Sequence, residues 1–364
     1  MRVIVSAGGT GGHIYPALAI INKIKEEEPN SEFLYIGTTN RMEKDIVPKY
    51  GIKYKGIEVS GFKRKLTLDN FKTLMQYLKA RKKCLTIIDK FKPDVVIGAG
   101  GYVTGPVIWA AKKLKKKTFI HEQNSVVGLA NRYLSKYADR IGVCFESAKL
   151  SLPKEKVYLT GNPCSDIARK CKKINIEDYG LEKDKKTVLI VMGSLGSRAV
   201  NDKIMEFISE FGRKDYQVIF IVGKDYLKNN KVVSVPKNVK LVSYIDNLPG
   251  LMKSVDLMIS RAGASTISEI TAIGVPTIFI PSPYVTNNHQ YKNAMDLVNR
   301  KAALIIEEKD LNKTNLFKEI DRVLKNSKNY EILKENVRKL AVDNSSDKIY
   351  EILKDLILDD KRFF

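Results

Sequence analysis

The 364-residue sequence has few of the residues that build metal centres, disulfide frameworks or membrane spans. Its four cysteines lack the spacing of a zinc site or a disulfide framework. No Asp-x-Asp occurs, which disfavours a divalent-metal clamp on a nucleotide diphosphate. No apolar run approaches the ~20 residues that cross a bilayer, and the start, MRVIVSAGG, lacks the layout of a signal peptide. We therefore expect a cytoplasmic protein without metal or cofactor, which meets a membrane only at its surface.

The charge is strongly unbalanced, with a formal net charge of +22 at pH 7. Such a balance favours anionic partners, namely nucleic acid, an acidic membrane surface or phosphorylated substrates. It does not choose among them, and lysines spread over solvated faces would give the same total. A hydrophobic content of 44% indicates a globular chain, and the length favours two domains.

Short apolar strands alternate with amphipathic helices, first from RVIVSA to KVYLTGNP and again from TVLIVMG to AALIIEE. The two halves are joined near residues 164–186. Continuous apolar strands between helices are typical of parallel sheets covered on both faces. The pattern predicts an α/β protein with two doubly wound, Rossmann-like domains whose parallel sheets face a central cleft.

Four glycine-rich turns follow predicted strands: GGTGGH (8–13), GAGGYVTG (98–105), MGSLGS (192–197) and SRAGAST (260–266). Ligands of such sheets bind at the carboxyl ends of the strands. GGTGGH does not fit the G-x-G-x-x-G dinucleotide pattern, and no Walker A sequence occurs. A helix predicted to start near Ile14 would direct its positive end at a bound anion, so the turns indicate a site for phosphate or a similar oxygen-rich group.

The chain has only three histidines: His13, His121 and His289. His13 lies on the first glycine turn and is the best candidate for a general base, because imidazole titrates near neutral pH. His121, in HEQN, fits a buried orienting role better. The hydroxyls of SRAGASTISEI suit a diphosphate, Glu269 could accept hydrogen bonds from a ribose diol, and NNHQ (287–290) could bind sugar hydroxyls or only cap a helix.

The segment GFKRKLTLDNFKTLMQYLKARKKC (61–84) mixes basic residues with Phe62, Leu66, Leu68, Phe71, Leu74 and Met75. A basic amphipathic segment of this kind can lie on anionic lipid. It can equally be a surface helix that packs its apolar face inward, and the sequence leaves both readings open.

Several motifs, in order over residues 3–300, resemble those of the MurG-type transferases of glycosyltransferase family 28: GGTGGHIYPALA, GAGGYVTGP, HEQNSVVGLANRYLSKYA, MGSLGSRAVN, SRAGASTISEI and NHQYKNA. The resemblance implies the GT-B fold and metal-independent, inverting transfer of N-acetylglucosamine (GlcNAc). The donor would be UDP-GlcNAc and the acceptor the 4-hydroxyl of undecaprenyl-diphosphate-MurNAc-pentapeptide, which converts lipid I to lipid II in peptidoglycan synthesis. It also implies a peripheral protein on the cytoplasmic face of the plasma membrane, with other cell-wall synthesis proteins as further partners.

The resemblance further implies a division of labour along the chain. Residues 1–163 would bind the acceptor and the membrane, residues 164–340 would bind UDP-GlcNAc, and residues 341–364 would form a helix that crosses back to the first domain.

Carried onto matching positions, the resemblance makes His13 the base or a close neighbour of it. Asn124 would hold the GlcNAc, Ile245 would meet the uracil through its backbone, and Glu269 would bind the ribose. The full set expected to bind the donor is Thr10, Gly11, Gly12, Asn124, Ser165, Ser194, Ile245, Ala264, Ser265, Thr266, Ile267, Ser268, Glu269, His289 and Gln290. Gly100, Gly101, Tyr102 and Thr104 would face the acceptor's diphosphate.

The sequence departs from the family where an arginine often follows GNP, because this chain reads GNPCSD. Ser165 stands near that position without a charge, and Arg169 or Arg261 is expected to compensate. Three other functions stay open on sequence grounds. A UDP-GlcNAc 2-epimerase would need cleft carboxylates, for which Glu122 and Glu269 are the candidates. A diacylglycerol glycosyltransferase would share the glycine turn. A nucleic-acid-binding protein is disfavoured, because the charge is spread along the chain and no recognition motif occurs.

Overall fold

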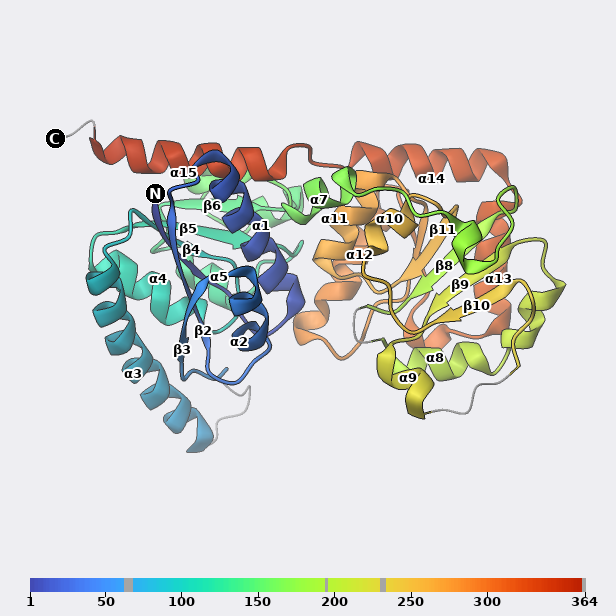
Figure 1. Cartoon of the computed structure of the whole chain (residues 1–364), viewed down its shortest axis with the longest axis horizontal. Helices are drawn as coiled ribbons and strands as arrows, with labels where there is room; N and C mark the ends of the chain where they lie inside the picture. Colours follow the sequence, from blue (N-terminus) through green and yellow to red (C-terminus); the bar gives the residue numbers. More distant parts are fainter. Residues whose placement is uncertain (62–67, 194–195, 230–233, 362–364) are drawn as a thin grey trace. The chain divides into compact units, whose positions relative to one another are not determined.

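The computed structural model describes residues 1–61, 68–193, 196–229 and 234–361. The chain divides into two compact units, of which the first contains residues 1–164 and 342–364 and the second contains residues 165–341. Each unit is an α/β layer structure built on one parallel sheet (Figure 1).

The first unit has a seven-stranded sheet in the order β3-β2-β1-β4-β5-β6-β7, in which every neighbouring pair is parallel. Its strands are β1 (Arg2–Ser6), β2 (Glu32–Thr38), β3 (Lys53–Ile57), β4 (Val95–Gly98), β5 (Lys117–Glu122), β6 (Arg140–Val143) and β7 (Val157–Leu159). Its helices are α1 (Gly11–Glu27), α2 (Glu43–Ile46), α3 (Leu68–Phe91), α4 (Thr104–Lys113), α5 (Leu129–Leu134), α6 (Glu146–Lys149) and α15 (Ser345–Lys361). The short helix α7 (Cys164–Lys170) begins at the boundary between the units.

Two apolar clusters, one on each face, cover this sheet. One joins β1 and β4 to α1 and to α15, which lie side by side (Figure 1). The other joins the sheet to α3 and α4. Because helices cover both faces, the central strands are apolar without alternation, as the buried pattern of β1 and β4 shows.

The second unit has a six-stranded parallel sheet in the order β10-β9-β8-β11-β12-β13. Its strands are β8 (Thr187–Val191), β9 (Gln217–Ile221), β10 (Val239–Val242), β11 (Leu257–Ser260), β12 (Thr277–Phe279) and β13 (Leu304–Ile305). Its helices include α8 (Arg198–Met205), α9 (Lys224–Asn229), α10 (Leu248–Met252), α11 (Ala264–Ile273), α12 (His289–Val298), α13 (Lys313–Leu324) and α14 (Ser327–Lys339).

The strand order of each sheet reverses at one point, between β1 and β4 in the first unit and between β8 and β11 in the second. Open parallel sheets bind ligands outside the carboxyl ends of the strands at such a reversal. The turns GGTGGH and GAGG follow β1 and β4, and MGSLGS and SRAG follow β8 and β11. All four glycine-rich turns therefore flank these two points.

The predicted fold class, two doubly wound units with parallel sheets, is confirmed. Helix α3 spans residues 68–91, and α11 begins at Ala264. Helix α1 begins at Gly11 rather than near Ile14, so part of the first glycine turn is helical. In the part of the chain that the structure describes, no helix is both long and apolar enough to cross a bilayer.

Candidate active site

The first glycine turn leads into a helix start at which the N–H groups of residues 10–12 can bind an anion. Thr10 is the extended N-cap of α1, and Gly11, Gly12 and His13 form the first turn. Among the described residues, the backbone N–H groups of Thr10, Gly11 and Gly12 have no acceptor. The first turn of α1 holds no acidic side chain. These donors and the positive end of the helix are suited to an oxygen-rich ligand.

A buried carboxylate that sequence reasoning missed, Glu43 of α2, supports this turn. One oxygen, Oε2, accepts from the N–H of Gly9 at 3.1 Å, and Oε1 accepts from the N–H and the hydroxyl of Thr38 at 3.0 and 2.7 Å. A Cβ on Gly8 would lie 2.4 Å from Oε1, so this glycine makes room for the carboxylate. No sequence motif marks Glu43, because its partners belong to two separate strand ends.

The second glycine turn packs on the first, backbone against backbone. Gly100 and Gly101 have φ of +104° and +88°, a conformation that favours glycine. The N–H of Gly8 donates to the carbonyl of Gly100 at 3.2 Å, and a Cβ on Gly101 would lie 2.4 Å from the carbonyl oxygen of Gly8. A Cβ on Gly100 would lie 2.4 Å from Nδ1 of His13. The turn is thus shaped to receive the imidazole.

Two of the residues predicted to face the acceptor differ in their exposure. The side chain of Tyr102 is 59% exposed at the tip of the turn. Thr104 is fully buried, and its hydroxyl donates to the carbonyl of Gly100 at 2.8 Å. The structure places Thr104 beneath the turn as a support, which argues against a direct contact between its side chain and a substrate.

The HEQN segment at the end of β5 is joined to α1 by a side-chain hydrogen bond. Nδ1 of His13 lies 3.0 Å from Oε1 of Gln123. His121 is fully buried, as a structural role requires, and burial lowers its pKa. Its Nε2 lies 2.9 Å from the carbonyl oxygen of Gly161. The sequence offered His13 as a base but did not reveal Gln123 as its partner.

Glu122 organises the loop after β5 rather than facing a ligand. One oxygen, Oε1, accepts from the N–H and side-chain amide of Asn124, at 2.9 and 3.2 Å. The other, Oε2, accepts from the N–H of Gly128 and the amide of Asn131, at 3.0 and 2.9 Å. The carboxylate is 2% exposed. It therefore fixes Asn124, which is partly exposed, and is not placed to act as an acid or base on a substrate.

In the second unit, α11 also begins without a side-chain cap and without an acidic residue in its first turn. The N–H groups of Ala264, Ser265 and Thr266 precede the first backbone hydrogen bond of the helix, which runs from the N–H of Ile267 to Gly263. They are suited to a diphosphate.

Ile267 and Ser268, the next residues of α11, use their donor groups in hydrogen bonds within the helix. The side chain of Ile267 is buried, and its N–H is used by the helix. The hydroxyl of Ser268 donates to the carbonyl of Ala264 at 2.8 Å. A ligand at this helix start would therefore meet the N–H groups of Ala264 and Thr266 rather than the N–H of Ile267 or the hydroxyl proton of Ser268.

Glu269, one turn further along α11, is half-buried and has no hydrogen-bond or ion-pair partner among the described residues. Desolvation raises the pKa of its carboxyl to about 7. A carboxylate without a protein partner is available for the hydroxyls of a ligand, which would compensate the cost of its burial.

Arg261, one of the two arginines expected to replace the missing arginine after GNP, is held by partners within the second unit. Its guanidinium lies 2.5 Å from Glu308, in an ion pair that is largely buried. The same group donates to the hydroxyl of Ser197 at 2.7 Å and to the carbonyl of Ile280 at 3.0 Å. Arg261 thus joins the turns after β8, β11 and β12 and has its donors committed. For both Arg169 and Arg261 the compensating role stays a prediction.

The remaining residues predicted to contact the donor belong to the second part of the chain. Oε1 of Gln290 accepts from the N–H of Ser282 at 2.9 Å, and Nδ1 of His289 lies 2.9 Å from the carbonyl oxygen of Thr286. Ile245 is partly exposed after β10. Ser165 is buried near the start of α7, and Ser194 lies outside the described residues.

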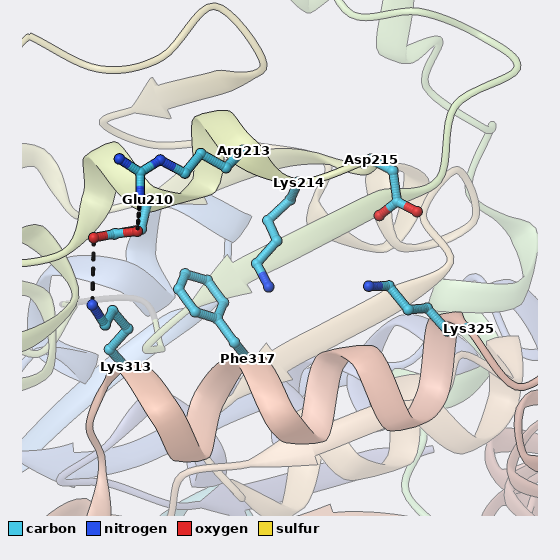
Figure 2. A pocket seen from close by; sticks show the side chains of 7 residues that line it. All are labelled: Glu210, Arg213, Lys214, Asp215, Lys313, Phe317 and Lys325. Carbon is cyan, nitrogen blue, oxygen red and sulfur yellow. Dashed lines mark hydrogen bonds and ion pairs between the residues drawn. The ribbon is translucent and has the colours of Figure 1, made fainter.

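A hollow of about 470 Å³ lies elsewhere in the second unit, where Lys214 and Asp215 lead into the amino end of β9 (Figure 2). Four cationic side chains line it. Arg213 and Lys313 are paired with Glu210, and Lys214 and Lys325 are paired with Asp321. Because these cations already have carboxylate partners and lie at the end of β9 away from the glycine turns, the hollow is not the candidate active site.

Helix α3 carries an exposed apolar stripe. Phe71, Leu74, Met75 and Leu78 are spaced i, i+3, i+4 and i+7, so they share one face of the helix, and all four are exposed, Phe71 by 68%. Lys72, Lys79, Lys82 and Lys83 are exposed on the same helix. Phe62 and Leu66 lie outside the described residues, and the side chain of Leu68 is not described. Within the described part of α3, the reading that all its apolar residues pack inward is wrong.

Two family models match the chain. The glycosyltransferase family 28 N-terminal domain matches residues 3–143, and the glycosyltransferase family 28 C-terminal domain matches residues 187–351. A UDP-N-acetylglucosamine–N-acetylmuramyl-(pentapeptide) pyrophosphoryl-undecaprenol N-acetylglucosamine transferase of Bacillus cytotoxicus is 46% identical over 364 residues, which cover 98% of this chain and 100% of that protein. The protein of the same name from Halalkalibacterium halodurans is 44% identical over 361 residues, 98% of this chain and 99% of that protein.

Solved structures show the same fold. Acinetobacter baumannii MurG matches with a TM-score of 0.78 at 26% identity, over 97% of this chain and 99% of that chain. The UDP-GlcNAc 2-epimerase from Neisseria meningitidis, solved with UDP-GlcNAc, matches with a TM-score of 0.67 at 17% identity, over 98% and 100%. At the latter identity the likeness concerns the fold alone.

Proposed function

The chain belongs to glycosyltransferase family 28, and from that premise we propose that it transfers GlcNAc from UDP-GlcNAc to the 4-hydroxyl of undecaprenyl-diphosphate-MurNAc-pentapeptide. The resemblance drawn from its motifs is confirmed, as are the GT-B fold and the activity class of a glycosyltransferase. The observation that carries the substrate assignment is the 46% identity, over nearly the whole chain, to proteins named for this transfer.

Each unit would then serve one substrate. The second unit would hold UDP-GlcNAc, with the N–H groups at the start of α11 on the diphosphate, Glu269 on the ribose diol, Ile245 on the uracil, and His289 and Gln290 on sugar hydroxyls. The first unit would hold the acceptor, near Tyr102. Two features of the described residues support this assignment: the N–H groups of Ala264 and Thr266 lie ahead of the first hydrogen bond of α11, and the carboxylate of Glu269 has no partner there.

The reaction forms a bond between the acceptor oxygen O4 and the anomeric carbon of GlcNAc, with inversion, and breaks the bond between that carbon and the UDP oxygen. O4 gives up its proton as it attacks, and His13, in the first turn of α1, would receive it. Negative charge grows on the leaving diphosphate. The N–H groups and dipole of α11 would stabilise it, as oriented donors do for developing anions.

The alternative of a 2-epimerase rests on the shared fold and on two candidate carboxylates. Glu122 is excluded from an acid–base role by its burial and its four hydrogen bonds, so only Glu269 remains of the pair. The transferase is therefore the better-supported function.

One assay separates these functions. UDP-GlcNAc with a labelled sugar is incubated with a polyprenyl-diphosphate MurNAc-pentapeptide, and in parallel with diacylglycerol. We expect label only in the MurNAc lipid. Label in diacylglycerol would indicate the lipid glycosyltransferase, and release of UDP with neither lipid labelled would indicate hydrolysis or epimerisation. Either outcome would overturn the proposed transfer.

The exposed stripe of α3 supports a peripheral attachment to anionic membrane. Its apolar side chains can enter the interface while the neighbouring lysines meet lipid phosphates. We expect the protein to sediment with vesicles that contain an anionic phospholipid and to do so less at high salt. Leu74→Glu should weaken this binding. Leu150→Glu is a matched control, because Leu150 is 86% exposed in the first unit but lies off α3. Equal binding by both variants would remove α3 as the attachment site.

A further inference from the structure

The amide of Gln123 can adopt only one orientation in its surroundings. The side chain is 1% exposed. Its nitrogen Nε2 lies 3.1 Å from the backbone carbonyl oxygen of Ala99, which can only accept a hydrogen bond. The NH₂ group therefore faces Ala99, and the amide oxygen Oε1 faces His13, 3.0 Å from Nδ1.

This orientation determines which nitrogen of His13 carries the proton in the neutral ring. An amide oxygen can only accept, so the hydrogen bond at 3.0 Å requires Nδ1 of His13 to donate. The lone pair of the neutral imidazole is then on Nε2. Gly100 lies against Nδ1, where a Cβ would come within 2.4 Å, and this close packing restricts the ring further.

The second proton of the amide leads to the other histidine. Nε2 of Gln123 lies 3.0 Å from Nδ1 of His121, which must accept because the amide nitrogen only donates. The proton of His121 is therefore on Nε2, which donates to the carbonyl of Gly161 at 2.9 Å. Complete burial favours the neutral form of this ring and lowers its pKa, which is consistent with an accepting Nδ1.

The four groups form one chain of donors and acceptors with a fixed direction. It runs from His13 through Gln123 and His121 to the carbonyl of Gly161, and a branch ends at the carbonyl of Ala99. The chain and its branch both end at backbone carbonyls, which can only accept. If the Gln123 amide were reversed, its oxygen would face the carbonyl oxygen of Ala99 and the lone pair on Nδ1 of His121. Such a mismatch leaves buried polar groups unsatisfied, which is far more costly in a buried network than at the surface.

We propose that Gln123 and His121 are positioning residues that hold His13 in its Nδ1–H form, so that Nε2 is the nitrogen that accepts the acceptor's proton. The proposal rests on the role of His13 as base in the proposed function. It gives two residues of HEQN a role without contact with a substrate. Gln123, after β5, supplies a neutral amide, and the buried ring of His121 fixes the orientation of that amide.

The test uses Gln123→Met, which keeps the length of the side chain but removes both hydrogen-bonding groups. Gln217→Met is the matched control, because Gln217 is also 1% exposed and fully hydrogen-bonded, at the start of β9 in the second unit. In protein with ¹⁵N-labelled histidine, NMR at pH 8 distinguishes the protonated ring nitrogen from the one with a lone pair. Only three histidines are present, and His13→Ala assigns the signals of His13.

We expect Nδ1 of His13 to carry the proton in the wild type and in Gln217→Met, and both tautomers to be populated in Gln123→Met. The kcat of Gln123→Met should fall ten- to hundredfold, part of the ~10²–10⁴ that a positioned base contributes. Its KM for UDP-GlcNAc should not change, and Gln217→Met should keep the wild-type kcat.

A double-mutant cycle shows whether Gln123 acts through His13. In the His13→Ala background, Gln123→Met should lower kcat no further, and an equal fall in both backgrounds would overturn the proposal. A proton on Nε2 of His13 in the wild type would also overturn it, even in an active enzyme. If the wild type makes no labelled MurNAc lipid, the proposed function fails instead, and the tautomer is still measurable.

Discussion

Replacing Gly100 with alanine places one methyl group against the imidazole of His13. The added Cβ would lie 2.4 Å from Nδ1, whereas ordinary contacts begin at 3.4 Å. Gly101 and the first glycine turn hold the Gly100 backbone in place, so the ring must retreat by about 1 Å, enough to lengthen its hydrogen bond to Gln123. A displacement of this size costs about 10²-fold in rate.

The same change strains the backbone, because Gly100 has φ of +104°, and this costs about 1–2 kcal/mol for a residue with a Cβ. Gly51→Ala separates the two effects, since Gly51 has φ of +68° but no atom within 4 Å of an added Cβ. We expect Gly51→Ala to lose stability and keep its kcat. Gly100→Ala should lose a similar amount of stability and also about 10²-fold in kcat.

The assay measures kcat for GlcNAc transfer together with the binding of UDP-GlcNAc by calorimetry. Binding of the donor should be unchanged in Gly100→Ala, which shows that the second unit is intact. A folded Gly100→Ala protein with a kcat within twofold of the wild type would refute the reasoning, because the position of the imidazole would then not limit the reaction.

Three further predictions concern carboxylates. The KM for UDP-GlcNAc should rise as the pH falls below 7, because Glu269 has a pKa of about 7 and its carboxyl becomes protonated there, whereas ribose hydroxyls favour the ionised form. Glu269→Gln should remove this dependence of KM on pH when it is measured from pH 6 to 8. Glu308→Ala should destabilise the second unit by about 3–5 kcal/mol, because Arg261 loses its buried partner. The loss should appear as a lower urea midpoint when unfolding is followed by circular dichroism. The urea midpoint followed by the fluorescence of Trp109 should not change, because this single tryptophan lies in the first unit. Glu43→Ala should instead shift the Trp109 transition and weaken acceptor turnover, because Gly9 and Thr38 lose the oxygens that hold the first glycine turn.

The sequence predicted well those features that depend on local pattern. The apolar runs of β1 and β8 are continuous because both faces of each sheet are covered, and this revealed the parallel sheets. The sequence did not indicate β3, KYKGI, because this edge strand alternates between exposed and partly buried residues and has no continuous apolar run. It also placed the start of α1 too late, because Gly11 and Gly12 have low helix propensity and gave no sign that they are helical.

For the candidate active site, the sequence indicated motifs but not the contacts between them. GGTGGH and HEQN both stood out as motifs. The hydrogen bond between His13 and Gln123 joins residues 110 positions apart, and that between Gly9 and Glu43 joins residues 34 apart. Such contacts depend on which strand ends are neighbours in the sheet, so no spacing rule reveals them. For the same reason Arg261, an apparent phosphate ligand in the sequence, proved to be bound to Glu308.

The position of α15 sets the order in which a nascent chain can complete its two cores. Ile349, Tyr350, Leu353 and Leu356 of α15 are buried in the same core as α1, although the whole second unit separates them from α1 in the sequence. The second unit is continuous, from 165 to 341, and can close its core while synthesis continues. The helix that carries His13 must wait for α15 with its apolar face uncovered. A chain that stops before Ser345 would therefore keep the second unit intact and leave the apolar side chains of α1 that face α15 uncovered.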